Sequence, residues 1–306
     1  MLFAKLHKKY ELQFQITISF LPIYHNVSVH VLNPQRRYLL KSSFLSNFVI
    51  LNCNEPVMKI VINPRYQRLS YFINELPMKF DTSGETLYQG RNQVKAFQVQ
   101  GYPIVVKRYK RPSFIQRVIY SWFRPTKACR AYNFAFWMQK LGIQTPEAIA
   151  YIEINHHGLF IDSYFVSLRC NDTPLFPILV NEPQYDKQLA HELAIYIVEL
   201  HKKGFLHGDL NLANILYRQE NGKPIFTFID TNRSHFIKSP TPKVCLKNLM
   251  RITHRIDLLR EIVQTYAEQR GWDAVKSCDQ VEAMLHHFER KRAYKYQLKK
   301  IIKSTR

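Results

Sequence analysis

The sequence predicts an α+β protein of two lobes, the first β-rich and the second mostly helical. In the first lobe, residues 94–100 and 104–109 have the composition and alternation of two strands joined by a tight turn. From Gln188 onward the patterns are helical and are broken by one hairpin, whose Asn221-Gly222 pair favours a type I′ turn. With 306 residues and 46% hydrophobic content, the chain is long enough for each lobe to bury a core.

The first 57 residues are interpreted as an N-terminal extension of unclear role. Residues 12–20 alternate between apolar and polar side chains, which is the period of a half-buried strand. The extension carries no recognisable catalytic pattern, and Met58 opens the segment that runs into the enzyme-like region, so an over-long start is an alternative. We expect residues 58–170 to form the β-rich lobe and residues 171–306 to form the helical lobe.

Further elements of the first lobe follow in order along the chain. A helix is predicted after Pro125 and is expected to stop at Gly142. Strand patterns return at residues 148–154 and 164–168. The polar stretch at residues 169–174 is expected to form the hinge between the lobes.

The chain is strongly basic, with 44 Lys and Arg residues against 23 Asp and Glu residues and a formal net charge of +21. This surplus predicts an anionic partner such as a nucleotide or an acidic lipid. Nucleic acid is not expected, because the chain has no recognisable nucleic-acid-reading motif. Five cysteines without paired spacing, and no apolar run near the roughly 18 residues of a membrane helix, favour a cytoplasmic location.

An ordered set of polar side chains follows the helix predicted at residues 188–203. His207 and Asp209 come first, Asn214 lies five residues after the aspartate, and an apolar strand beyond the hairpin ends at Asp230. Each of these residues alone would be interpreted as a core histidine, a helix cap or a solvated loop acid. The order and spacing of the whole set match protein kinases and predict a two-lobed protein-kinase-like fold.

Phosphoryl transfer needs a carboxylate that orients the attacking hydroxyl, and oxygen ligands that hold Mg²⁺ against the nucleotide phosphates. Asp209 matches the first requirement and is the predicted catalytic residue. Asn214 and Asp230 match the second and are the predicted metal ligands. The expected cofactors are therefore ATP and Mg²⁺.

Candidate nucleotide-binding residues lie in the strand predicted at residues 104–109. Alternation places Val105 and Lys107 on one face, where an apolar side chain can contact adenine and an ammonium can pair with phosphate oxygens. Lys107 is therefore also a candidate catalytic residue. Gly90 is the single glycine of the short segment 88–92 and is the candidate for a turn that covers the phosphates.

The acid that usually pairs with the kinase lysine is missing, because no Asp or Glu occurs between Lys107 and Glu147. By spacing, Asn133 takes that place. An opposite charge at about 4 Å contributes on the order of 4 kcal/mol at an effective dielectric of 20 before desolvation, whereas Asn offers a neutral hydrogen bond. We therefore expect reduced turnover, and a nucleotide-binding pseudokinase is an alternative.

Four segments carry a resemblance to a known family: residues 105–109, 142–147, 164–168 and 207–214, of which only the last is specific to kinase chemistry. From Met58 to about Asp273 the chain resembles the bacterial lipopolysaccharide core kinases of the Kdo/WaaP type, including versions found in Bacteroides-like bacteria. The resemblance implies ATP-dependent phosphorylation of a sugar hydroxyl in the lipopolysaccharide inner core, on Kdo or heptose. It also implies an anionic glycolipid as partner and peripheral contact with the inner face of the inner membrane.

Two positions favour a sugar over a protein substrate. Gly208 stands where regulated protein kinases have an Arg that reads activation-loop phosphate, and Asn211 stands where Ser/Thr kinases usually have Lys. Thr231 and Asn232 replace the Phe-Gly pair that normally follows the metal-binding Asp, so control by loop phosphorylation is not expected. A small-molecule kinase of the aminoglycoside or choline type is an alternative, although such enzymes usually line the acceptor site with acids.

Two basic stretches are candidates for contact with a membrane or glycolipid. Residues 111–127 interleave Arg and Lys with aromatic residues such as Phe114 and Trp122, which would either face lipid or pack into the first lobe. Residues 290–306 contain basic residues and no acid, and the alternative for them is a solvated terminal helix.

Overall fold

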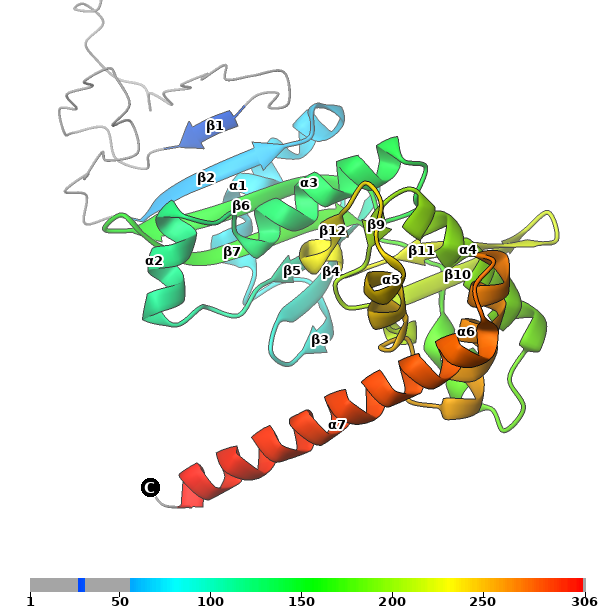
Figure 1. Cartoon of the computed structure of the whole chain (residues 1–306). Helices are drawn as coiled ribbons and strands as arrows, with labels where there is room; N and C mark the ends of the chain where they lie inside the picture. Colours follow the sequence, from blue (N-terminus) through cyan, green and yellow to red (C-terminus); the bar gives the residue numbers. More distant parts are fainter. Residues whose placement is uncertain (1–26, 31–55, 305–306) are drawn as a thin grey trace, which may run out of the picture. The chain divides into compact units, whose positions relative to one another are not determined.

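The structure is a computed structural model that describes residues 27–30 and 56–304 (Figure 1). The strand predicted at residues 12–20 lies outside these described residues. The chain divides into two compact units, of which the first holds residues 1–132 and 147–169 and the second holds residues 133–146 and 170–306. A β-rich unit followed by a mostly helical unit confirms the predicted fold class. The sequence-based domain limits stay a prediction.

The first unit contains an antiparallel sheet of seven strands, in the order β1-β2-β6-β7-β5-β4-β3 (Figure 1). The strand predicted at residues 104–109 is β5, which pairs with β4 and β7. The strands are β1 (Val27–His30), β2 (Val57–Ile62), β3 (Glu85–Gln89), β4 (Gln93–Val99), β5 (Tyr102–Arg108), β6 (Ala148–His156) and β7 (Leu159–Leu168).

Alternation along β5 agrees with the sequence pattern. Ile104 and Val106 are fully buried in the core of the first unit, whereas Val105 and Lys107 are half-buried on the opposite face. The same core receives the apolar side of the helix α1 (Ser70–Lys79). The turn between β4 and β5 has positive φ at both central residues, as the predicted tight turn requires.

Two further helices follow β5. The helix α2 (Phe114–Trp122) was not predicted as a helix from the sequence, and α3 (Lys127–Lys140) confirms the helix expected between Pro125 and Gly142. Gly142 adopts a φ of 67°, the left-handed region that glycine enters without steric cost, and it ends the helix where the sequence predicts.

The second unit is built on helices that pack around one hydrophobic core. Residues of α4 and α6, such as Leu193, Ile197 and Ile262, are fully buried in this core. The hairpin turn at Asn221 and Gly222 has φ values of 52° and 74°, which confirms the predicted type I′ geometry. The helices are α4 (Lys187–Lys202), α5 (Pro242–Leu249), α6 (Ile256–Gln269) and α7 (Ala274–Ser304).

Two small antiparallel sheets of the second unit carry the segments of the predicted catalytic pattern. One has the order β11-β10-β8 and the other pairs β12 with β9. Their strands are β8 (Thr173–Pro174), β9 (Phe205–Leu206), β10 (Ile215–Glu220), β11 (Lys223–Phe228) and β12 (His235–Phe236). In the described part of the chain, no helix is long and apolar enough to cross a membrane.

Candidate active site

The candidate site of the second unit is built from two loops, which we name the catalytic loop (residues 207–214) and the metal loop (residues 229–234). The catalytic loop follows β9, and the metal loop lies between β11 and β12. The catalytic loop starts at the end of β9 and the metal loop ends at the start of β12, and these two strands pair with each other. The main-chain N–H of Ile229 donates to the carbonyl oxygen of Asn214 at 3.0 Å, which holds the loops together.

His207 connects the two loops from inside the core. Its Nε2 donates to the carbonyl oxygen of Ile229 at 2.9 Å, and its Nδ1 accepts the N–H of Asp209 at 3.2 Å. The side-chain amide of Asn248 donates to the carbonyl oxygen of His207 at 2.8 Å. Burial lowers the pKa of His207 below its usual value, which favours the neutral ring. His207 therefore has a scaffold role, as the sequence predicts.

Asp209 is half-buried at the centre of the catalytic loop. Its carbonyl oxygen accepts hydrogen bonds from the side-chain amides of Asn211, at 3.0 Å, and Asn214, at 2.9 Å. Its carboxylate Oδ1 lies 2.6 Å from Nη2 of Arg251, and its Oδ2 lies 3.9 Å from Nη1 of Arg233. Two guanidinium groups therefore surround the predicted catalytic carboxylate.

The sequence predicts that a strand ends at Asp230. In the structure β11 ends two residues earlier, at Phe228, so Asp230 lies in the loop that follows the strand. Asp230 adopts a left-handed φ of 56° and begins the short 3-10 turn Thr231–Arg233. The strand before it is anchored by Thr145, whose hydroxyl donates to the carbonyl oxygen of Phe228 at 2.8 Å. This contact gives a structural reason for the Gln-Thr-Pro segment seen in the sequence.

The oxygen groups of the catalytic and metal loops fit a magnesium ion shared with a nucleotide. Asp230 and Asn214 offer carboxylate and amide oxygens, the ligand type that Mg²⁺ prefers. Asn232 donates to Asp230 Oδ1 through Nδ2, while its buried Oδ1 has no hydrogen-bond partner. No cluster of three His, Cys, Asp or Glu residues suited to a metal occurs among the described residues. In kinases, Mg²⁺ takes further ligands from the phosphate oxygens of the nucleotide.

Gly208 is required by the close approach of the two loops. A Cβ atom at this position would lie 1.9 Å from the carbonyl oxygen of Arg233 and 2.4 Å from its carbonyl carbon. These are main-chain atoms, so no rotamer change can relieve the contact. The sequence analysis notes only that Gly208 stands where regulated protein kinases have an Arg. The structure adds a steric reason for glycine at this position.

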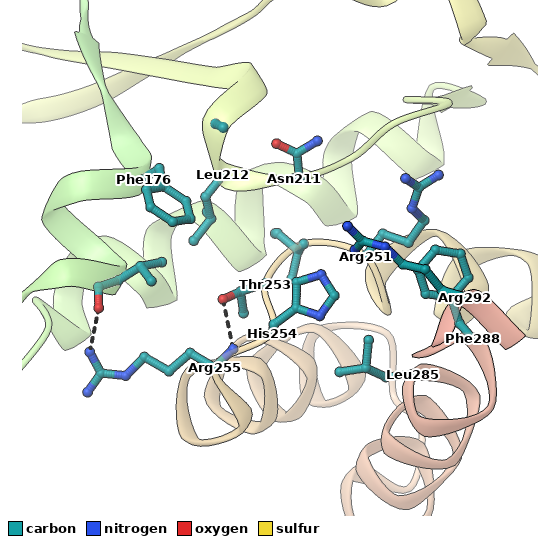
Figure 2. Close-up of a pocket in the computed structure, with 13 residues that line it drawn as sticks. Phe176, Asn211, Leu212, Arg251, Thr253, His254, Arg255, Leu285, Phe288 and Arg292 are labelled. Carbon is teal, nitrogen blue, oxygen red and sulfur yellow. Dashed lines mark hydrogen bonds between the residues drawn. The ribbon is translucent and has the colours of Figure 1, made fainter. Parts of the chain in front are cut away.

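A pocket of about 500 Å³ opens beside the catalytic loop (Figure 2). Asn211 and Leu212 of the catalytic loop form part of its wall, and Arg251, Phe288 and Arg292 form another part. The guanidinium of Arg251 lies over the Phe288 ring, 5.3 Å from its centroid, while its Nη2 bonds Asp209. None of the described residues that line the pocket is acidic.

Arg251 was missed in the sequence, and Arg292 was noted only as part of the basic stretch 290–306. Arg251 lies 42 positions after Asp209, and Arg292 lies in a basic helix. No motif spacing relates either residue to the catalytic pattern, so the fold alone brings them to the pocket.

The predicted nucleotide-binding residues belong to the first unit. Val105 and Lys107 share one face of β5, and Lys107 pairs across the ladder with Val94 and Phe165. Gly90 lies in the turn between β3 and β4, where its N–H donates to the carbonyl oxygen of Asn92 at 3.1 Å. This bond uses the Gly90 amide inside the turn, so any phosphate contact there would have to come from other groups.

Gly90 also lines a pocket of about 400 Å³ together with the basic residues Arg91, Arg108 and Lys110. Asn133 lies half-buried in α3, within the second unit. The structure therefore brings together Asp209, Asn214 and Asp230 in the second unit, and Val105 and Lys107 in the first. The roles assigned to these residues remain predictions.

Comparison with known proteins identifies a family. The family model of the lipopolysaccharide kinase (Kdo/WaaP) family matches residues 87–278. A curated 3-deoxy-D-manno-octulosonic acid kinase from Vibrio vulnificus is 24% identical over 132 residues, which cover 42% of this chain and 56% of that protein. The chain thus matches a little over half the length of this curated relative.

A solved structure described as WaaP in complex with acyl carrier protein has a TM-score of 0.50 and 15% sequence identity to this chain. The match covers 76% of this chain and 97% of that one, which shows a shared kinase-like fold. The family match extends over more than half of the chain and includes β5, the catalytic loop and the metal loop. The chain belongs to the lipopolysaccharide kinase (Kdo/WaaP) family.

Proposed function

We propose that this protein is an ATP- and Mg²⁺-dependent kinase that phosphorylates a sugar hydroxyl of the lipopolysaccharide inner core. The observation that carries the proposal is the hydrogen-bonded pair of loops that holds Asp209 beside Asn214 and Asp230. Family membership supports the same reaction, since the curated relative is named as a kinase of an acidic sugar.

In the proposed reaction, the Asp209 carboxylate accepts a hydrogen bond from the acceptor hydroxyl and orients it towards the γ-phosphorus. Asn214 and Asp230 would hold Mg²⁺, which neutralises charge on the phosphates when bound. Lys107 would pair with phosphate oxygens of the nucleotide. Arg251 keeps the Asp209 carboxylate in one orientation before the acceptor arrives.

The pocket beside the catalytic loop is proposed as the acceptor site. It adjoins the catalytic loop, and Arg251 connects it directly to Asp209. Its basic groups and its lack of acids suit a carboxylate or phosphate on the acceptor. The same lining argues against aminoglycosides and choline, because the charged side chains among its described residues include three arginines and no carboxylate.

Transfer of labelled phosphate from ATP to a Kdo-bearing lipid A precursor tests the reaction. We expect transfer by the wild type and a loss on the order of 10³-fold in Asp209→Asn, which removes the charge that orients the hydroxyl but keeps the side-chain shape. Circular dichroism and ATP binding should be unchanged in the variant. A wild type that binds ATP yet phosphorylates no core glycolipid would contradict the proposal and favour a pseudokinase.

The acceptor site is tested by Arg292→Gln, with Arg290→Gln as the matched control. Both arginines are exposed on α7, but only Arg292 lines the pocket. We expect the KM for the anionic acceptor to rise about 3- to 10-fold in Arg292→Gln, because one charge-assisted contact is lost, while the KM for ATP stays constant. Equal acceptor KM values in the two variants would exclude this pocket.

A glycolipid acceptor is embedded in a membrane, so the proposed reaction takes place at a bilayer surface. We propose that the protein works there as a peripheral protein on the cytoplasmic side of the inner membrane. The net charge of +21 supports this location through attraction to acidic headgroups.

A further inference from the structure

The helix α2 exposes its apolar side chains, although it is strongly amphipathic. None of its residues is buried. The exposed fractions are 63% for Phe114, 73% for Ile115, 39% for Ile119 and 45% for Trp122, and Phe123 at its C-terminal end is 79% exposed. The spacing of residues 115, 119, 122 and 123 places these side chains on one face of the helix. Within the described residues, this face has no cover.

The polar side of α2 attaches the helix to the sheet of the first unit. Nε of Arg117 donates to the carbonyl oxygen of Phe160 in β7 at 2.8 Å. The N–H of Phe160 donates in return to the hydroxyl of Ser121, also at 2.8 Å. The ring of Tyr120 lies edge-on to the Phe160 ring, with centroids 5.6 Å apart.

These contacts reverse the usual arrangement of a surface helix, in which the apolar face is buried and the polar face meets water. Two hydrogen bonds and an aromatic contact keep the polar face of α2 against β7. The apolar face is therefore held outward and cannot be buried by a simple rotation of the helix. An exposed apolar face of this kind marks an interaction surface.

The charges around α2 indicate what covers this face. Lys110 and Arg124 flank the helix and are exposed, and the exposed Arg111 beside Lys110 pairs with Asp162 of β7 at 3.0 Å. No acidic residue occurs between Lys107 and Glu147, so α2 and the segments on either side of it carry basic residues and no acid of their own. Aromatic and aliphatic side chains on one side, with basic residues at both ends, match a helix that lies in the interface of an anionic bilayer.

We propose that α2 is the element that docks this protein on an anionic lipid surface. Ile115, Ile119, Trp122 and Phe123 enter the boundary between headgroups and acyl chains, and the flanking basic residues pair with lipid phosphates. From the sequence alone, the aromatic residues of this stretch would either face lipid or pack into the first lobe. Their exposure in the structure favours contact with lipid. The inference does not depend on the proposed catalytic reaction.

Vesicle co-sedimentation tests the proposal with the full chain and without ATP or acceptor. The vesicles contain phosphatidylcholine alone, or phosphatidylcholine with phosphatidylglycerol. We expect the wild type to bind the vesicles that contain phosphatidylglycerol. The double variant Ile115→Gln/Phe123→Gln should bind at least roughly tenfold less, because two apolar side chains no longer leave water on binding.

The matched control is Tyr71→Gln/Met78→Gln on α1, which also removes two highly exposed apolar side chains from the first unit. It should bind vesicles like the wild type. Arg124→Gln should lower binding only to the vesicles with phosphatidylglycerol. The fluorescence of Trp122 gives a second measurement, since its emission should shift to shorter wavelength with vesicles and the Trp122→Phe variant should lose this shift.

Three results would overturn the proposal. The first is a wild type that binds neither kind of vesicle. The second is an α2 double variant that binds as well as the wild type, which would assign lipid binding to the basic end of α7. A wild type that is dimeric while the α2 variant is monomeric, without vesicle binding, would assign the face to a second copy. Transfer of phosphate to a water-soluble acceptor should be equal in the wild type and the α2 variant, so failure of lipid docking is separable from failure of catalysis.

Discussion

Replacing Asp230 with Asn should lower the rate of phosphoryl transfer on the order of 10³-fold, because a metal ligand loses its charge. Asp230 has a φ of 56°, and Asn is one of the few residues that tolerate this left-handed conformation. The new amide oxygen can still accept from Nδ2 of Asn232, so the turn should persist. The variant therefore removes charge with little change in backbone geometry, which Asp230→Ala would not do.

The measurement is the rate of transfer from ATP over a series of Mg²⁺ concentrations. The apparent affinity for Mg²⁺ should fall in Asp230→Asn, while the melting temperature should stay close to that of the wild type. Asp279→Asn is the control, because Asp279 is an exposed acid of α7 outside the two loops. A variant with the wild-type rate and Mg²⁺ dependence would exclude Asp230 as a metal ligand.

Features fixed by local chemistry could be predicted from the sequence. The Asn221-Gly222 pair predicted the hairpin turn, since both residues enter positive φ at low cost. Gly142 predicted the end of α3 for the same reason. Alternation placed Val105 and Lys107 on one face of β5, opposite the buried core.

Features fixed by tertiary contacts could not be predicted. Pro77 lies inside α1 and lowers the helical signal of that segment, although packing of Ile73 and Leu76 into the core stabilises the helix. The pairing of Arg251 with Asp209 joins residues 42 positions apart and leaves no pattern in the sequence. The outward direction of the apolar face of α2 depends on hydrogen bonds to Phe160, which the helix pattern does not reveal.

Gly208 is another residue whose role depends on a tertiary contact. Its φ does not require glycine, but a side chain at this position would clash with Arg233 of the metal loop, more than twenty residues later in the sequence. We expect Gly208→Ala to lower the free energy of unfolding by about 1–3 kcal/mol or more, the usual range for overpacking. Separation of the catalytic and metal loops by about 1 Å should also lower the transfer rate on the order of 10²-fold, because the reacting groups lose their alignment.

Gly222→Ala is the matched control for this prediction. Gly222 has a φ of 74° in the second unit and has open space around its Cα, so alanine there introduces left-handed strain of roughly 1–2 kcal/mol but no clash. Urea unfolding of both variants measures the loss of stability, and transfer kinetics measure the loss of alignment between the two loops. The control should lose stability and keep its rate, whereas Gly208→Ala should lose both. If Gly208→Ala kept the wild-type rate, the close contact with Arg233 would not be what aligns Asp209 with Asp230.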